Sequence, residues 1–226
     1  TRCGIIQPKK TKTMKAKWIL MVALAAFAQL SNAREKSVTV FVRGGVTESF
    51  LLSADNDKLL TGFKLGMGTQ ISLLKSGRLV LLPTVELAQK GGVIASEYGG
   101  TVTMRGLYVH VPLDVALQFR ARKGRYITIA MGPYIGYGVG GKIYGSDGMY
   151  FYRHIPVDRH YDMFGKEADL QRWDSGLHTM FQYEFNRVLV GASFEMGFKS
   201  IFKEEWSAYS NATTPCALSL HIGYRF

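Results

Sequence analysis

Apolar and polar residues alternate with a period of two along most of the chain beyond residue 36. In "GLYVHVPLDVALQF", every second residue from Leu107 to Phe119 is apolar, whereas His110, Asp114 and Gln118 lie on the opposite face. Successive side chains of a β-strand point to opposite sides, so this pattern predicts a strand with one apolar face. We find no convincing helix period in this part of the chain.

Eight such segments follow one another, at residues 38–46, 61–73, 79–90, 106–119, 126–140, 177–185, 188–198 and 217–226. Tight turns at 75–78, 122–125 and 185–187 alternate with longer links at 51–60, 91–100, 142–172 and 201–215. An even number of strands with short turns at one end and long loops at the other is typical of outer-membrane barrels. The sequence therefore predicts an all-β fold, an eight-stranded antiparallel up-and-down transmembrane β-barrel.

The last predicted strand runs to the final residue and carries aromatic side chains at Tyr224 and Phe226. In lipid it must pair with the first strand, because an open sheet edge leaves backbone groups without partners. We expect the two aromatic rings to lie at the membrane–water interface. Such a terminal strand also resembles the signal that the outer-membrane assembly machinery reads.

The N-terminal region predicts export. Residues 14–33 combine a basic start, an apolar run and small residues before position 34, which is the pattern of a cleavable signal peptide. A membrane-anchoring helix is the alternative, but the apolar run is short for a span. We interpret residues 1–13 as an upstream, non-native extension and residues 34–226 as the barrel domain, in the bacterial outer membrane with both termini periplasmic.

The formal charge of +11 is partly due to residues 1–33, which hold six basic side chains. Residues 34–226 retain 22 basic and 17 acidic side chains, scattered along the sequence. Nucleic acid is therefore not an expected partner. Cys216 is the one cysteine beyond Cys3, so no intramolecular disulfide is expected in the mature chain, and no spacing predicts a metal site or cofactor.

A soluble barrel or sandwich also shows alternation, but its apolar face points inward. Two features favour lipid outside. The faces opposite the apolar ones are rich in Gly, Ala and Ser, as a narrow interior requires, and no disulfide supports the fold. The expected partners are outer-membrane lipid, lipopolysaccharide and the assembly machinery.

Five stretches together resemble the PorT-like outer-membrane β-barrel family of Bacteroidetes. They are "LLPTVELAQKGG", "YVHVPLDVALQF", "AMGPYIGYGVGGK", "RWDSGLHTMFQYEFNRVLVGASFEMGF" and "LSLHIGYRF", in an order and spacing that agree from about residue 37 to the end. The resemblance implies an eight-stranded outer-membrane barrel. It implies no particular function, because the roles within the family are diverse.

The polar faces predict a lumen network that consists of Arg43, Lys64, Glu86, His110, Asp114, His178, Glu184, Glu195, His221 and Arg225. The interior of an eight-stranded barrel is just filled by side chains. We therefore expect ion-paired side chains to fill the lumen, without an open pore. A narrow transporter of small solutes is one alternative. Another is a lipid-modifying enzyme with His178, Ser193 and Glu195 as a triad, but no motif surrounds these residues, and we predict no enzymatic activity.

The long link at 142–172 alternates aromatic residues with charges, as binding surfaces often do. It predicts an extracellular binding loop for an unidentified ligand, through Tyr144, Tyr150, Phe151, Tyr152, Arg153, Tyr161 and Phe164. A loop that packs on itself to cap the barrel is the equal alternative. His154 and His160 with Asp158 and Asp162 match no standard metal spacing.

Overall fold

The computed structural model describes residues 38–52, 57–95, 101–146, 148–150, 153–155, 160–165, 170–202 and 214–226, all within the unit Ser37–Phe226. The predicted upstream extension and signal peptide lie outside the described residues. Among the described residues, no helix is long and apolar enough to span a membrane.

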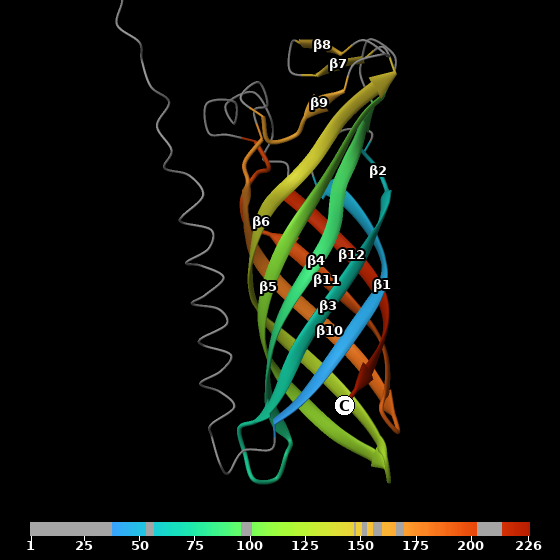
Figure 1. The fold of residues 1–226 in the computed structure, drawn as a ribbon, viewed down its shortest axis with the longest axis vertical. Helices are drawn as coiled ribbons and strands as arrows, with labels where there is room; N and C mark the ends of the chain where they lie inside the picture. The colour runs from blue at the N-terminus through green and yellow to red at the C-terminus, as the bar shows by residue number, and fades with distance from the viewer. Residues whose placement is uncertain are drawn as a thin grey trace, which may run out of the picture. The chain divides into compact units, whose positions relative to one another are not determined.

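Eight long strands form a closed antiparallel barrel (Figure 1). Neighbouring strands pair in chain order, and the ring closes where β1 pairs with β12, with Gly45 opposite His221. The predicted fold is thereby confirmed. The strands are β1 (Val38–Leu52), β3 (Leu60–Ser72), β4 (Leu79–Ala95), β5 (Thr101–Arg122), β6 (Arg125–Ser146), β10 (Trp173–Phe185), β11 (Val188–Gly197) and β12 (Thr214–Arg225).

Three tight turns connect strands at one end of the barrel, which we name the turn end; the opposite end is the loop end (Figure 1). Each turn contains a residue with positive φ: Gly77 at 66°, Gly124 at 72° and Asn186 at 56°. Glycine and asparagine adopt this conformation more readily than other residues, which explains their places in the turns.

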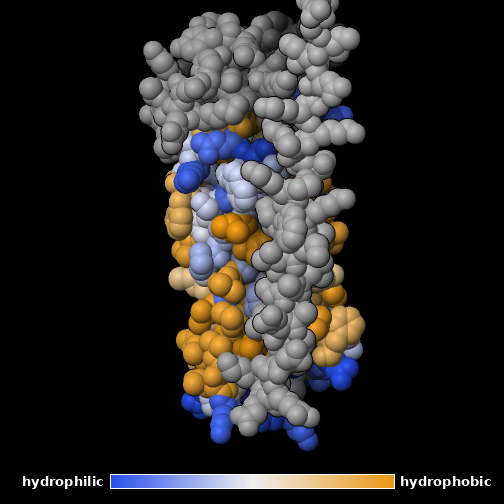
Figure 2. All heavy atoms as spheres, turned by 60° about the vertical axis from the view of Figure 1, so that its left-hand side comes forward, coloured by the Kyte–Doolittle hydropathy of each residue, from blue (hydrophilic) through white to orange (hydrophobic). Residues whose placement is uncertain are grey.

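The alternation along each strand separates an apolar exterior from a polar interior. On β5, Leu113 is 46% exposed, whereas Asp114 beside it is fully buried inside the barrel. Figure 2 shows apolar side chains over much of the outer wall and hydrophilic side chains at the lower, turn end. An apolar exterior is what a bilayer requires of a barrel wall.

The structure differs from the sequence prediction at the loop end, where strands continue into the predicted links. β5 and β6 have 22 residues each, roughly twice the 9–11 that a strand needs to cross a membrane. β4 extends to Ala95 and β5 begins at Thr101, so residues 96–100 are what remains of the link at 91–100. Four short strands add to this end: β2 (Asp57–Lys58), β7 (Gly148–Tyr150), β8 (Arg153–Ile155) and β9 (Tyr161–Asp162).

The polarity of the two faces reverses in these extensions. On β5, Val102 and Met104 point inward and are buried, although the inward positions deeper in the barrel are polar. On β6, a register shift opposite Leu107 and Tyr108 adds one residue and turns Ile143 inward. Beyond the membrane the wall meets water, so apolar side chains are more stable inside.

Candidate functional site

The described interior of the barrel contains two apolar clusters with a polar layer between them, and further polar side chains, among them Gln118, Gln182 and Glu184, lie on the turn side of the lower cluster. An apolar cluster near the turn end, which we name the plug, consists of Phe41, Val80, Leu82, Ala116, Ala130, Met180 and Leu189. A second apolar cluster at the loop end, which we name the cap, consists of Leu51, Val102, Met104, Tyr108, Ile143, Met163, Phe164, Leu170, Ile201 and Phe202. Charged and polar side chains lie between them, and we name them the central layer.

Two carboxylates in the central layer are each held by two cations. Glu86 accepts hydrogen bonds from the Arg43 guanidinium at 2.6 and 2.9 Å, and its second oxygen lies 3.5 Å from the Lys64 ammonium. Glu195 binds the same Lys64 ammonium through one oxygen and the Lys90 ammonium, at 2.6 Å, through the other. Lys64 therefore links the two carboxylates, and this pairing offsets the cost of burying their charges.

Two histidines extend this layer. His178 Nδ1 lies 2.8 Å from Asp114, and both side chains are fully buried. His110 Nδ1 lies 3.2 Å from Glu195, and the His110 ring stacks on Tyr134 at 5.1 Å between centroids. These contacts connect β5, β6, β10 and β11 across the lumen.

The structure brings most of the predicted lumen residues together. Nine of the ten are buried in the interior, and Arg225 is half-buried near the turn end, 2.5 Å from Glu184. This pair is separate from the central layer. His221 lies against Gly191, where an added Cβ would meet its Nε2 at 2.7 Å.

Sequence reasoning missed three members of the central layer, Lys90, Asp174 and Tyr134. The Lys90 ammonium lies 3.3 Å from Asp174, which also accepts a hydrogen bond of 3.1 Å from the Tyr134 hydroxyl. The period-two pattern could have found two of them. Lys90 lies four residues after Glu86, and Asp174 lies four residues before His178, each on the same strand face.

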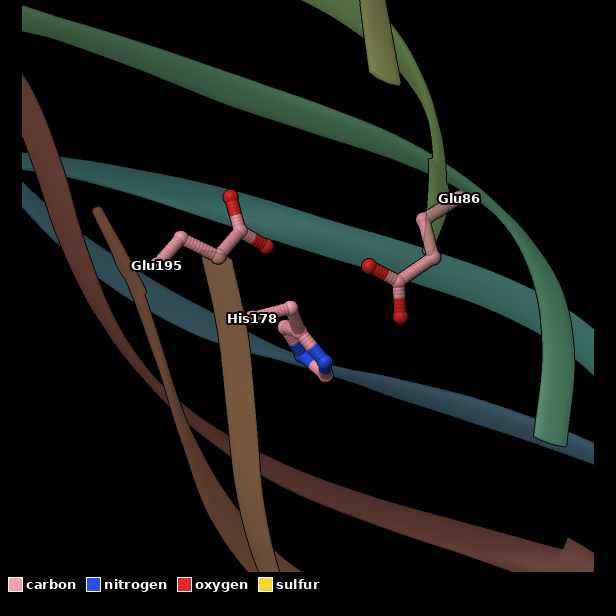
Figure 3. Close-up of side chains that lie close together, drawn as sticks. All are labelled: Glu86, His178 and Glu195. Carbon is pink, nitrogen blue, oxygen red and sulfur yellow. The ribbon is translucent and has the colours of Figure 1, made fainter. Parts of the chain in front are cut away.

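Glu86, His178 and Glu195 come close enough to be considered as metal ligands. One ligand atom from each lies within 4.8 Å of the others, and the side chains reach into a shared space (Figure 3). The Asp114 carboxylate on His178 Nδ1 also resembles the outer shell of metal sites. However, the Lys64 ammonium already contacts both glutamates, so a divalent ion would have to displace a buried, paired cation. The arrangement favours an ion-pair network.

The alternative enzymatic triad is not assembled. The Ser193 hydroxyl lies 3.5 Å from the Lys64 ammonium, and His178 is bonded to Asp114. Among the described residues, no hydrogen bond joins Ser193 to His178. A nucleophile without a base in hydrogen-bond reach does not form the arrangement that nucleophilic catalysis requires.

Part of the predicted binding loop folds inward and contributes to the cap. Phe164 is buried, and its ring meets Tyr108 edge-on at 5.6 Å between centroids. An added Cβ at Gly138 would meet the Phe164 ring at 2.2 Å, so this glycine makes room for the ring. Arg172 donates a hydrogen bond of 2.8 Å to the Phe164 carbonyl and lies over its ring. A surface-binding role for Phe164 was therefore a wrong expectation.

Two further residues that were predicted to lie in the binding loop belong to strands instead. Tyr144 lies within β6 rather than in a loop, half-buried, with its ring against His160. Tyr161 lies in β9, which pairs with β6, and packs against the cap. The reason is that β6 continues beyond the predicted strand end, and β9 pairs with this extension.

The hairpin of β7 and β8 contains the rest of the predicted binding residues that the structure describes. Tyr150 pairs with Arg153, and Met149 pairs with His154. Phe151 and Tyr152, between the two strands, lie outside the described residues, as does Asp158. The hairpin forms a two-stranded sheet apart from the barrel sheet.

The predicted terminal aromatic pair lies at the turn end. Phe226 is exposed, its backbone N–H donates to Val40 O at 2.9 Å, and its ring meets that of Tyr224 at 5.3 Å between centroids. Tyr224 is paired with Val42 on one side and with Val188 on the other. The last strand is thus bound on both edges.

Comparison with known families gives a match to the family described as outer membrane protein beta-barrel domain, over residues 27–203. The chain is also similar to solved outer-membrane proteins. The attachment invasion locus protein Ail of Yersinia pestis, in complex with a heparin analogue, is 12% identical, covering 84% of this chain and 99% of that one, with a TM-score of 0.42.

Neisserial surface protein A is 10% identical, over 84% of this chain and 99% of that one, with a TM-score of 0.47. The outer membrane protein OprG from Pseudomonas aeruginosa is 10% identical, over 84% of this chain and 97% of that one, with a TM-score of 0.42. A search of curated proteins found no match.

Proposed function

Because the chain belongs to the outer membrane β-barrel domain family, we propose that it is a closed, non-conducting barrel that acts at its loop end as a structural or surface-binding protein. The layered interior carries this proposal. A plug, a paired ionic layer and a cap follow one another along the lumen. Side chains that fill the lumen leave the outer surface for interactions.

The finer assignment is the PorT-like family of Bacteroidetes, supported by the five ordered stretches of sequence. We further propose that residues 14–33 are a signal peptide, that both termini are periplasmic, and that Tyr224 and Phe226 belong to an assembly signal. Outer-membrane lipid and lipopolysaccharide are the proposed surroundings. The protein is proposed to have no enzymatic activity, in keeping with the contacts of Ser193 and His178.

The hairpin of β7 and β8 is the proposed contact for an extracellular ligand. It forms its own two-stranded sheet, and its sequence from 148 to 155, "GMYFYRHI", combines aromatic and basic residues. Aromatic residues and arginine are enriched at binding surfaces. The side chains of the cap are buried and leave the hairpin as the candidate contact.

Electrical recording tests the closed barrel. The refolded protein in planar lipid bilayers should give no steady conductance at either polarity, and a folded general porin in the same bilayers provides the positive control. Steady, reproducible single-channel openings of the wild-type protein would contradict the proposal and favour the narrow transporter. Adhesion of whole cells to immobilised matrix proteins and polysaccharides, with and without the hairpin, tests the surface role.

A further inference from the structure

The basic side chains that are scattered along the sequence gather at the turn end of the barrel. We name this set the basic rim, and it consists of Lys75, Arg78, Arg120, Arg122, Lys123, Arg125, Arg187 and Arg225. Among the described residues, one carboxylate, Glu184, lies with it. The structure describes 17 basic and 8 acidic residues, so 9 basic and 7 acidic ones lie elsewhere in the described part of the chain. Most of the net positive charge of the described residues is therefore located at one end.

The basic rim is continuous along the turn end. Backbone hydrogen bonds, each of 2.8 Å, join neighbouring turns and strand ends: Gln118 N–H to Arg78 O, Asn186 N–H to Gly124 O, and Arg225 N–H to Arg187 O. The turn of β3 and β4 thus lies beside β5, the turn of β5 and β6 beside that of β10 and β11, and the latter beside the end of β12. The basic residues form one arc.

Most of the rim has no carboxylate to neutralise it. Arg225 is paired with Glu184, and the Arg125 guanidinium lies 4.9 Å from the centroid of the Phe185 ring. The other six side chains are exposed, and within the described part of the chain none of them forms a salt bridge. Six like charges on one arc repel one another unless anions lie between them.

Aromatic side chains mark the depth of the rim in the membrane. Phe119 and Tyr224 are exposed on the outer wall and immediately precede Arg120 and Arg225 in the chain. Exposed aromatic rings form girdles at both interfaces of transmembrane barrels. If Phe119 and Tyr224 belong to such a girdle, the basic groups next to them lie at the level of the lipid headgroups. Figure 2 shows hydrophilic side chains at this end, beyond the apolar wall.

We propose that the basic rim binds the phosphate groups of anionic phospholipids in the leaflet that the turn end faces. Guanidinium groups match phosphate oxygens with paired hydrogen bonds, and five of the seven basic residues of the rim other than Arg225 are arginines. Juxtamembrane basic residues are attracted to anionic leaflets in the same way. With periplasmic turns, as proposed above, this leaflet is the inner one. The rim belongs to the barrel wall and does not depend on the loop-end proposal.

Lipid selectivity in nanodiscs tests the proposal. The full barrel is reconstituted with equal amounts of phosphatidylglycerol and phosphatidylcholine, and the lipids that remain bound are identified by native mass spectrometry. The wild-type protein should retain phosphatidylglycerol preferentially. The triple variant Arg120→Gln/Arg122→Gln/Lys123→Gln should reduce this preference by roughly fivefold or more, and added salt should weaken the wild-type preference.

The matched control removes the same charge at the loop end. Lys58→Gln/Lys142→Gln/Lys199→Gln replaces three exposed lysines and should leave the lipid preference unchanged. Heat-modifiable migration on gels checks folding, and Lys75→Gln/Arg78→Gln replaces the rim triple if that variant does not fold. An absent wild-type preference, or an equal loss in the control, would overturn the proposal. So would binding of soluble polyglutamate at the rim without lipid selectivity, which would identify a docking site for an acidic protein.

Discussion

The central layer and the cap stabilise the same lumen by different means. In the central layer, charged side chains from the barrel strands are held in fixed pairs, such as Glu195 between Lys64 and Lys90. In the cap, apolar side chains from strand extensions and from the loop, such as Phe164, bury one another. Losing one partner of a buried ion pair leaves an uncompensated charge, whereas losing an apolar side chain costs in proportion to the cavity that remains.

The difference reflects what surrounds each region. The central layer lies behind an outer face that carries Leu113 and other exposed apolar residues, so polar groups must be inside. The cap lies where the strands have extended beyond the predicted membrane-spanning segments, and the apolar residues have moved inside. The reversal at Val102 and Met104 therefore indicates where β5 leaves the bilayer.

The largest expected effect comes from removing a shared carboxylate. Glu195→Ala leaves Lys64 and Lys90 without their common partner in a buried layer, which should destabilise the barrel by about 3–5 kcal/mol. Guanidinium unfolding in detergent, followed by heat-modifiable migration, measures the change. Glu48→Ala is the control, because Glu48 is only partly buried and bonds Thr61, and it should stay within about 0.5 kcal/mol. Equal effects would show that the central layer is not a stabilising network.

The second effect tests the outer face at the level of the central layer. Leu113→Arg places a charge on the lipid face and should cost about 2–4 kcal/mol at the midplane. Folding into vesicles, scored by protease protection, measures it. Leu113→Met is the matched control and should fold like the wild type. If Leu113→Arg folded normally into vesicles, the assignment of this face to lipid would be wrong.

The third effect concerns the cap. Phe164→Ala removes a buried ring that packs against Tyr108 and should cost about 3 kcal/mol, the low end for a buried phenylalanine, without preventing the barrel from forming. Unfolding in detergent gives the value. Tyr144→Ala, on the same end but half-buried outside the cap, should cost less. A cost for Phe164→Ala larger than that for Glu195→Ala, or a failure of the barrel to form, would remove the contrast between the two regions.

The barrel strands were predictable because lipid outside and a narrow lumen inside impose one alternation on all of them. The same alternation placed Glu86, Asp114 and Glu195 inside, where the structure has them buried. It could not give their pairing, since Lys64 meets Glu195 across the lumen from a distant strand. The cap was not predictable, because β5 and β6 change the polarity of their faces and a one-residue register shift turns Ile143 inward.

The smallest expected effect on stability is at the hairpin above the cap. The link at 142–172 cannot be removed as a whole, because Met163 and Phe164 belong to the cap and must stay. Deleting residues 148–155 alone removes β7 and β8, which form their own two-stranded sheet. Shortening a loop changes its closure entropy little, so stability should change by less than about 1 kcal/mol.

The same deletion should abolish cell adhesion if the hairpin binds the extracellular ligand. Surface protease sensitivity of intact cells confirms that the deleted protein reaches the outer membrane. A longer deletion that includes residues 163 and 164 should destabilise the barrel as Phe164→Ala does, and so separates the cap from the hairpin. If the short deletion unfolds the barrel, the hairpin is part of the cap. If it folds and adhesion persists, the ligand contacts another part of the loop end.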